Sequence, residues 1–212
     1  MDASLDGSTL ATKERDYSKN ARVRLWRLPR LEPIAELPHA QNVHSLKLSD
    51  DGTWLAGITG PGDVGVWEIP AMKGPPMWRG VTALQAHVVC AFSPDNRWLA
   101  AATDDGSAFL WDLATRRRTV LPRALSRYTS LSFSPDGSRL AAGSEGESKL
   151  FDVATGQAVL SFKQHGLQLA FARNGERLLA VHSGGASVVP APSFDSLRFD
   201  WLKEKPSQEA RP

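Results

Sequence analysis

No serine, cysteine or histidine of this chain stands in a pattern typical of catalysis. Ser144 lies in Gly143-Ser144-Glu145-Gly146, but no glycine stands two residues before it, and the segment indicates a turn rather than the strand-to-helix elbow of a nucleophilic serine. There is no phosphate-binding loop, no dinucleotide-binding fingerprint and no His-Glu-x-x-His sequence. We therefore predict no catalytic residue and expect the chain not to be an enzyme.

Metal-binding residues are equally scattered. The histidines belong to different parts of the chain, at positions 39, 44, 87, 165 and 182. No paired Cys motif accompanies them, so we expect neither a metal site nor a cofactor. Cys90, in Val88-Val89-Cys90-Ala91-Phe92, is the one cysteine, which excludes an internal disulfide. Its apolar neighbours indicate a small packed residue of a strand.

Composition limits the partners. The 25 Lys and Arg residues nearly balance the 23 Asp and Glu residues among 212, and the net charge of +2 is too small for a protein whose main task is to hold nucleic acid or an anionic membrane. No apolar run approaches the roughly 18 residues of a membrane span, and the first residues lack the pattern of a signal peptide. We expect a cytoplasmic protein without nucleic-acid or membrane partners.

Basic residues concentrate in two places. One is the triplet Arg116, Arg117 and Arg118, and the other is a set of arginines around Trp26 at positions 22, 24, 27 and 30. No aromatic stacking platform alternates with them, so solvated strand edges are a better interpretation than RNA contacts.

A four-residue turn pattern recurs along the chain at intervals of 45, 44, 41 and 38 residues. Its copies are Ser4-Leu5-Asp6-Gly7, Ser49-Asp50-Asp51-Gly52, Ser93-Pro94-Asp95-Asn96, Ser134-Pro135-Asp136-Gly137 and Ala172-Arg173-Asn174-Gly175. A second element keeps the same period, and a short apolar run follows each copy of the turn, beginning at Leu10, Leu55, Leu99, Leu140 and Leu179. That element is Val23-Arg24-Leu25-Trp26, Val64-Gly65-Val66-Trp67, Ala108-Phe109-Leu110-Trp111, Ser148-Lys149-Leu150-Phe151 and Ala186-Ser187-Val188-Val189.

One unit of this repeat predicts an antiparallel meander. Proline, aspartate and glycine at the turn each favour a tight reversal, and apolar segments flank it. An outer fourth strand fits the segment after each Trp or Phe, for example residues 157–162. Small sheets of this kind must stack face to face to bury their apolar sides, and a period of about 40 to 45 residues with four strands is that of a propeller blade. We predict an all-β fold of about five four-stranded antiparallel blades.

The sequence resembles the WD-repeat family of β-propellers, most closely in Phe92 to Thr115 and in Phe133 to Gly156. The resemblance extends over roughly residues 4 to 200. In this family a histidine, a serine or threonine, an aspartate and the tryptophan form a buried hydrogen-bond relay. The resemblance assigns those places in the third unit to four residues: His87, Thr103, Asp105 and Trp111.

The predicted units cover approximately residues 1–35, 36–80, 81–125, 126–162 and 163–200, followed by a polar tail at 201–212. The first blade is expected to be incomplete, because only a stub of an innermost strand precedes its turn. The fifth unit contains a plausible outer strand near residues 196–199. We interpret the array as the C-terminal part of a larger propeller; the alternatives are a compact five-bladed ring and closure by another chain.

The resemblance implies a non-catalytic scaffold for protein or peptide partners. Trp78, in an irregular segment beside Met77 and Arg79, and the triplet Arg116, Arg117 and Arg118 are the candidate partner contacts. One alternative is a regulatory module of a larger bacterial signalling protein or kinase. Another is a propeller enzyme or small-ligand sensor that uses the central channel.

Overall fold

The structure is a computed structural model of the 212-residue chain. It describes residues 1–14, 22–37, 43, 45–58, 64–69, 88–103, 105–123, 128–144, 147–162, 168–182 and 185–191.

The described residues form five antiparallel sheets, each built from strands consecutive in the sequence. Blade 1 contains β1 (Asp2–Ala3), β2 (Thr9–Glu14), β3 (Arg22–Arg27) and β4 (Glu32–Glu36), and blade 2 contains β5 (Ser45–Leu48), β6 (Trp54–Ile58) and β7 (Val64–Glu68). Blade 3 contains β8 (Val88–Phe92), β9 (Trp98–Thr103), β10 (Ala108–Asp112) and β11 (Arg117–Leu121), and blade 4 contains β12 (Tyr128–Phe133), β13 (Arg139–Ser144), β14 (Ser148–Asp152) and β15 (Ala158–Phe162). Blade 5 contains β16 (Gln168–Phe171), β17 (Arg177–His182) and β18 (Gly185–Pro190). The predicted all-β fold of about five blades is confirmed. Within these residues there is no helix that could cross a membrane.

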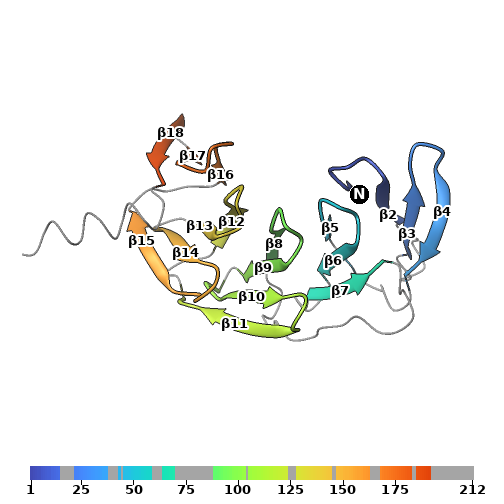
Figure 1. Ribbon diagram of the computed structural model, residues 1–212, viewed down its shortest axis with the longest axis horizontal. Coiled ribbons are helices and arrows are strands. Elements are labelled where there is room, and N and C mark those ends of the chain that lie inside the picture. The colour runs from blue at the N-terminus through green and yellow to red at the C-terminus, as the bar shows by residue number, and fades with distance from the viewer. Residues whose placement is uncertain are drawn as a thin grey trace, which may run out of the picture.

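The blades follow one another along an open arc (Figure 1). The first strand of each blade lies on the concave side, and successive inner strands contact one another, β1 with β5, β5 with β8, β8 with β12 and β12 with β16. The last strands of the four-stranded blades lie on the convex side (Figure 1). The two end blades, 1 and 5, stand apart across the mouth of the arc.

The recurring turn holds its shape through one serine and one aspartate. In blade 4 the hydroxyl of Ser134 donates to the carboxylate of Asp136 and accepts the backbone N–H of Arg139 at 2.9 Å. Asp136 in turn accepts the backbone N–H of Ser138 at 3.1 Å. Gly137 takes the positive φ of 71° that closes the turn. The same serine-to-aspartate bond forms at Ser4, Ser49 and Ser93.

Blade 5 has a weaker version of this turn. Ala172 stands where the other blades have serine, so no hydroxyl braces the turn. Asn174 replaces the aspartate and accepts the backbone N–H of Glu176 at 3.2 Å. The backbone bond from Gly175 N–H to the carbonyl of Ala172, at 2.8 Å, still closes the reversal.

The blades stack with a fixed direction. We call the side of a blade that looks toward the next blade its forward face, and the opposite side its backward face. Trp111 on the backward face of blade 3 is buried in one cluster with Ala56, Val64 and Val66 on the forward face of blade 2. This junction therefore joins a backward face that carries a large side chain to a forward face of aliphatic residues.

The other three junctions repeat this arrangement. Trp67 of blade 2 packs in a cluster with Ala11 and Leu25 of blade 1, and Phe151 of blade 4 packs in a cluster with Ala100 and Leu110 of blade 3. At the last junction, Leu178 of blade 5 clusters with Ala141 and Leu150 of blade 4, and Val189 packs against the same cluster. Repetition of one interface four times explains how short sheets obtain a continuous core.

A buried arginine also fastens blade 5 to blade 4. Arg139 of β13 is 4% exposed, and its guanidinium donates to the carbonyls of Ala191 at 2.6 Å and Gly175 at 2.8 Å. It also lies 5.4 Å from the ring centre of Phe171. Since all these partners belong to blade 5, Arg139 spans the junction.

Two details differ from the sequence prediction. Blade 1, expected to be incomplete, has four strands, although its innermost strand β1 is only two residues long. In blade 5, the apolar run expected to begin at Leu179 begins at Leu178, which stands opposite Val189 as Leu55 stands opposite Trp67 in blade 2. The outer strand expected near residues 196–199 lies outside the described residues, and the unit boundaries stay a prediction.

Candidate functional site

A groove of about 710 Å³ lies between blades 3 and 4. Its walls come from the turn before β9, the β10–β11 turn with the start of β11, the turn before β13 and the turn after β14. Because these turns follow the same repeat in both blades, their polar residues meet across one blade junction. The groove therefore gathers charged and hydroxyl side chains at a place that the repeat itself builds.

The carboxylates of the groove are largely engaged by their own turns. Asp112 accepts the backbone N–H groups of Ala114 and Thr115, both at 3.0 Å, and a 2.9 Å bond from Arg97. Burial raises the pKa of Asp112, but these three donors outweigh it and hold the pKa below its ordinary value. For Asp136, burial likewise raises the pKa, and the bonds from Ser134 and Ser138 lower it overall. Both side chains are thus held as anions with their hydrogen bonds made.

The cations of the groove differ in how much they are engaged. Arg97 is paired with Asp112, and its guanidinium lies 5.2 Å from the ring centre of Trp98. Arg118 lies over the ring of Phe109, also at 5.2 Å. Arg117 is exposed and has no hydrogen-bond or ion-pair partner among the residues that the structure describes. Arg117 is therefore the cation in this groove best able to meet a ligand.

The three arginines at positions 116 to 118 do not share one surface of blade 3. Arg116 lies in the β10–β11 turn with a positive φ of 59°. In the strand register, Arg117 stands opposite Asp112 and Arg118 stands opposite Trp111. Neighbouring residues of a strand alternate, so the two arginine side chains point to opposite faces of blade 3. Arg117 and Arg118 both line the groove, whereas Arg116 is not among its lining residues. Their role in partner binding stays a prediction.

Two of the four residues of the predicted relay are joined. The hydroxyl of Thr103 donates to the carboxylate of Asp105, and its oxygen also lies 3.1 Å from the carbonyl oxygen of Ser107. The bond from Thr103 is the main reason why the pKa of Asp105 lies below its ordinary value. Trp111 is buried at the junction with blade 2, and His87 lies outside the described residues. The complete relay stays a prediction.

Of the remaining candidate residues, Ser144 and Cys90 take structural positions. Trp78 lies outside the described residues. Ser144 is buried at the end of β13, where its hydroxyl bonds with the carbonyl of Glu147. Burial raises the pKa of Cys90 to about 12, which disfavours the reactive thiolate. No cluster of metal-binding side chains occurs in the part of the chain that the structure describes.

Antiparallel meanders stacked face to face along an arc are blades of a β-propeller. The family pattern described as "WD domain, G-beta repeat" matches residues 78–112 and 123–152, which include β8 to β10 and β12 to β14. The two matches show WD repeats in the part of the chain that contains blades 3 and 4. A comparison with curated proteins gave no match. WD repeats generally serve as scaffolds for protein interaction.

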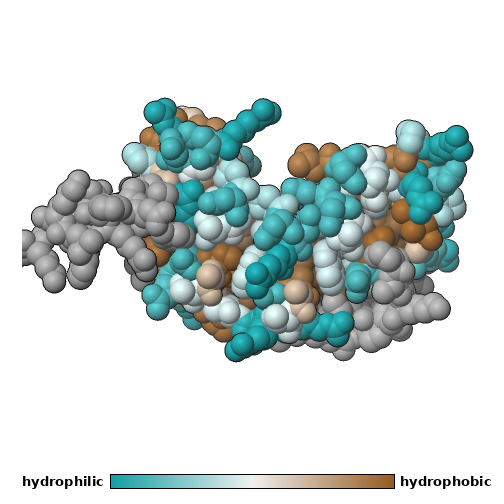
Figure 2. Space-filling model, viewed as in Figure 1, coloured by the Kyte–Doolittle hydropathy of each residue, from teal (hydrophilic) through white to brown (hydrophobic). Residues whose placement is uncertain are grey.

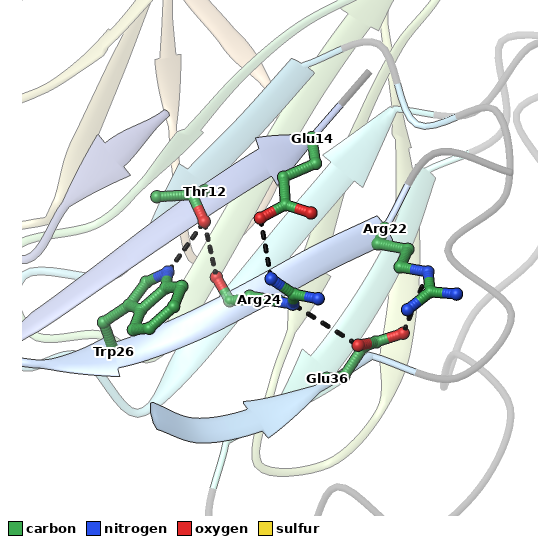
Figure 3. A network of polar contacts seen from close by, with 6 residues as sticks. All are labelled: Thr12, Glu14, Arg22, Arg24, Trp26 and Glu36. Atoms are coloured by element: carbon green, nitrogen blue, oxygen red, sulfur yellow. Dashed lines mark hydrogen bonds and ion pairs between the residues drawn. The ribbon is translucent and has the colours of Figure 1, made fainter. Parts of the chain in front are cut away.

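Sequence reasoning missed two features of the surface. The groove was not foreseen, although the recurrence of the turn pattern in neighbouring units could have indicated that Arg97 and Ser138 line one groove at a junction. The second feature is a polar network on the backward face of blade 1, shown in Figure 3. There the arginines at positions 22 and 24 meet Glu14 and Glu36, a pairing that could have been inferred only from the strand register.

Proposed function

We propose that this chain is a non-catalytic scaffold that holds an extended segment of a partner protein in the groove between blades 3 and 4. The observation that carries the proposal is the groove itself, a polar site of about 710 Å³ in which Arg117 is exposed without a partner among the described residues. The general role of WD repeats in protein interaction supports the same class of function.

The position of β11 supports an extended ligand. This strand is the last in its sheet, and four of its five residues are exposed. A peptide can lie along such an edge through main-chain hydrogen bonds and place alternate side chains toward the groove. Arg117 and Thr119 share the face of β11 that looks toward blade 4, as do their cross-strand neighbours Asp112 and Leu110. A peptide side chain on that face meets the guanidinium of Arg117, and an acidic side chain forms a charge-assisted bond with it.

The test is selection of short random peptides on the purified protein, followed by measurement of their affinity for two variants. Arg117→Glu reverses the charge in the groove and is expected to weaken the selected peptides by about tenfold or more. Arg30→Glu is the matched control, because Arg30 is 84% exposed and belongs to blade 1. The selected peptides should bind Arg30→Glu with the same affinity as the wild type.

Two results contradict the proposal. One is equal binding of the selected peptides to the wild type and Arg117→Glu, which places the binding surface elsewhere. The other is failure to select any peptide or protein whose binding depends on the folded chain. Circular dichroism and urea unfolding of both variants exclude loss of the fold as the cause of weaker binding.

A further inference from the structure

The forward face of blade 5 carries an exposed aliphatic group that none of the described residues covers. Leu179, Val181 and Val188 are 44%, 38% and 61% exposed, and Ala170 and Ala186 beside them are exposed as well. These residues lie on the side opposite Leu178 and Val189, which pack against blade 4. Figure 2 shows apolar side chains reaching the surface at this end of the arc. An exposed apolar group of this kind marks an interaction surface.

Strand register identifies what such a face binds elsewhere in the chain. In blade 2 the pair Ala56 and Val66 lies one position after the pair Leu55 and Trp67. In blade 5 the pair Leu179 and Val188 lies one position after Leu178 and Val189, and so occupies the place of Ala56 and Val66. Ala56 and Val66 are buried in a cluster with Trp111 of the next blade. The forward face of blade 5 therefore corresponds to the face of blade 2 that packs on blade 3.

The other half of that interface is also uncovered, on blade 1. Trp26 stands opposite Leu10, as Trp67 stands opposite Leu55 and Trp111 opposite Leu99. Trp67 and Trp111 are each 4% exposed because a preceding blade covers them, whereas Trp26 is only half-buried.

The surroundings of Trp26 are compatible with contact. Its indole N–H donates to Thr12 at 2.7 Å, so it needs no acceptor from outside (Figure 3). The arginines beside it already have Glu14 and Glu36 as partners.

The two unpaired faces belong to opposite ends of the arc and stand apart in the same molecule (Figure 1). We propose that they join between molecules: the forward face of blade 5 packs on the backward face of blade 1 of a second copy of this chain. Trp26 of one copy covers Leu179 and Val188 of the other, as Trp111 covers Ala56 and Val66 within the chain. Since the two faces are different, the contact is head to tail and builds a ring or a longer assembly rather than a face-to-face pair.

Sedimentation velocity over a wide concentration range tests the proposal. The wild type should form a species of at least twice the chain mass of 23.1 kDa. Leu179→Lys on blade 5 and Trp26→Gln on blade 1 should each give a monomer, because each removes one half of every contact. Val159→Lys is the matched control, since Val159 is an exposed aliphatic residue of β15 in blade 4, away from both faces. It should assemble like the wild type.

Mixing the two variants distinguishes a head-to-tail contact from a symmetric one. The Leu179→Lys chain keeps an intact blade 1 face and the Trp26→Gln chain keeps an intact blade 5 face, so the mixture regains one contact and should contain a dimer of the two. Assembly of Trp26→Gln alone would overturn the proposal in favour of blade 5 packing on itself. A monomeric wild type at all concentrations would overturn it as well, and would leave further blades of a longer protein to cover these faces. Urea unfolding of each variant verifies that it is folded.

Discussion

The two ends of the arc expose the same kind of sheet but treat its surface differently. On blade 1 the exposed backward face carries hydrogen-bonded and ion-paired side chains, with Thr12 receiving the indole N–H of Trp26 and Arg24 between Glu14 and Glu36 (Figure 3). On blade 5 the exposed forward face carries Leu179, Val181 and Val188. The polar groups of the first face already have partners and can stay exposed to water. Covering the apolar second face lowers the free energy, because it removes apolar surface from water.

This difference matters because repeat arrays depend on their terminal units. An inner blade has both faces covered by neighbours, but a terminal blade has one neighbour and therefore fewer contacts that hold it. Blade 5 has three described strands and a turn without the bracing serine. Its attachment depends to a large extent on Arg139 and the cluster around Leu178.

The largest expected effect is that of Arg139→Met, which removes the clasp between blades 4 and 5. The buried carbonyls of Ala191 and Gly175 then lose their donor, and we expect the free energy of unfolding to fall by about 3 kcal/mol. Urea unfolding measures the loss. The blade 5 amides should also exchange hydrogen faster than those of blades 2 and 3.

The control for that variant is Arg177→Met. Arg177 is an exposed residue of β17, and its replacement should change the free energy of unfolding by less than about 0.5 kcal/mol. Equal losses in the two variants would show that the junction does not depend on the guanidinium of Arg139.

Acid should destabilise the inner blades through their turns, which is the next effect in size. Hydrogen bonds hold the pKa values of Asp51, Asp105, Asp112 and Asp136 below the ordinary 3.8, in spite of their partial burial. A lowered pKa in the folded state stabilises the fold above the ordinary pKa, and that stabilisation is lost as the pH falls through the folded-state pKa. The urea midpoint should therefore fall as the pH drops from about 5 through the ordinary pKa of 3.8 and below it.

Asp136→Asn provides the comparison for this prediction. It should be less stable than the wild type at neutral pH and should lose less stability on acidification, since one titrating carboxylate is absent. The turn of blade 5 already has Asn174 in this position. A pH dependence unchanged by Asp136→Asn would contradict a role of the turn aspartates in stability.

The blades could be predicted from the sequence because their signal is local and repeated. A turn such as Ser134-Pro135-Asp136-Gly137 depends on hydrogen bonds within six residues, so its chemistry is visible in the sequence. The arc, the groove and the clasp of Arg139 depend on which residues meet across blade junctions. Arg139 and Ala191 are 52 positions apart, and no local pattern couples them.

The candidate site shows the same limit at the level of single residues. The sequence singled out Arg116, Arg117 and Arg118 as one basic triplet, but strand alternation separates the last two and the turn sets the first apart. The relay was assigned from family resemblance, and the described contacts connect only Thr103 with Asp105. A charge pattern in a sequence thus identifies a region, whereas the register decides which of its side chains share a surface.

Thr12→Val should produce a smaller loss, at the blade 1 end. Valine keeps the shape of threonine but cannot accept the indole N–H of Trp26, and we expect a cost of about 1 kcal/mol because water reaches this half-buried position. Thr12→Ser keeps the hydroxyl and should cost less. The unfolding midpoints of the two variants, measured side by side, separate the hydrogen bond from packing; a larger loss in the serine variant would contradict its importance.

The smallest expected effect is that of Arg24→Gln, which removes the centre of the ion-pair network on blade 1. Arg24 bonds to Glu14 at 2.8 Å and Glu36 at 3.4 Å, but its side chain is one third exposed and those of the glutamates are about half exposed. Exposed pairs of this kind contribute about 0.5 kcal/mol, and salt at about 1 M screens most of it. At a protein concentration where sedimentation detects only monomer, the variant and the wild type should therefore differ slightly in urea midpoint at low salt and converge at high salt. A loss of several kcal/mol in the monomer that persists at high salt would contradict this prediction. At concentrations where the chain assembles head to tail, the second chain covers this face, and the loss should be larger.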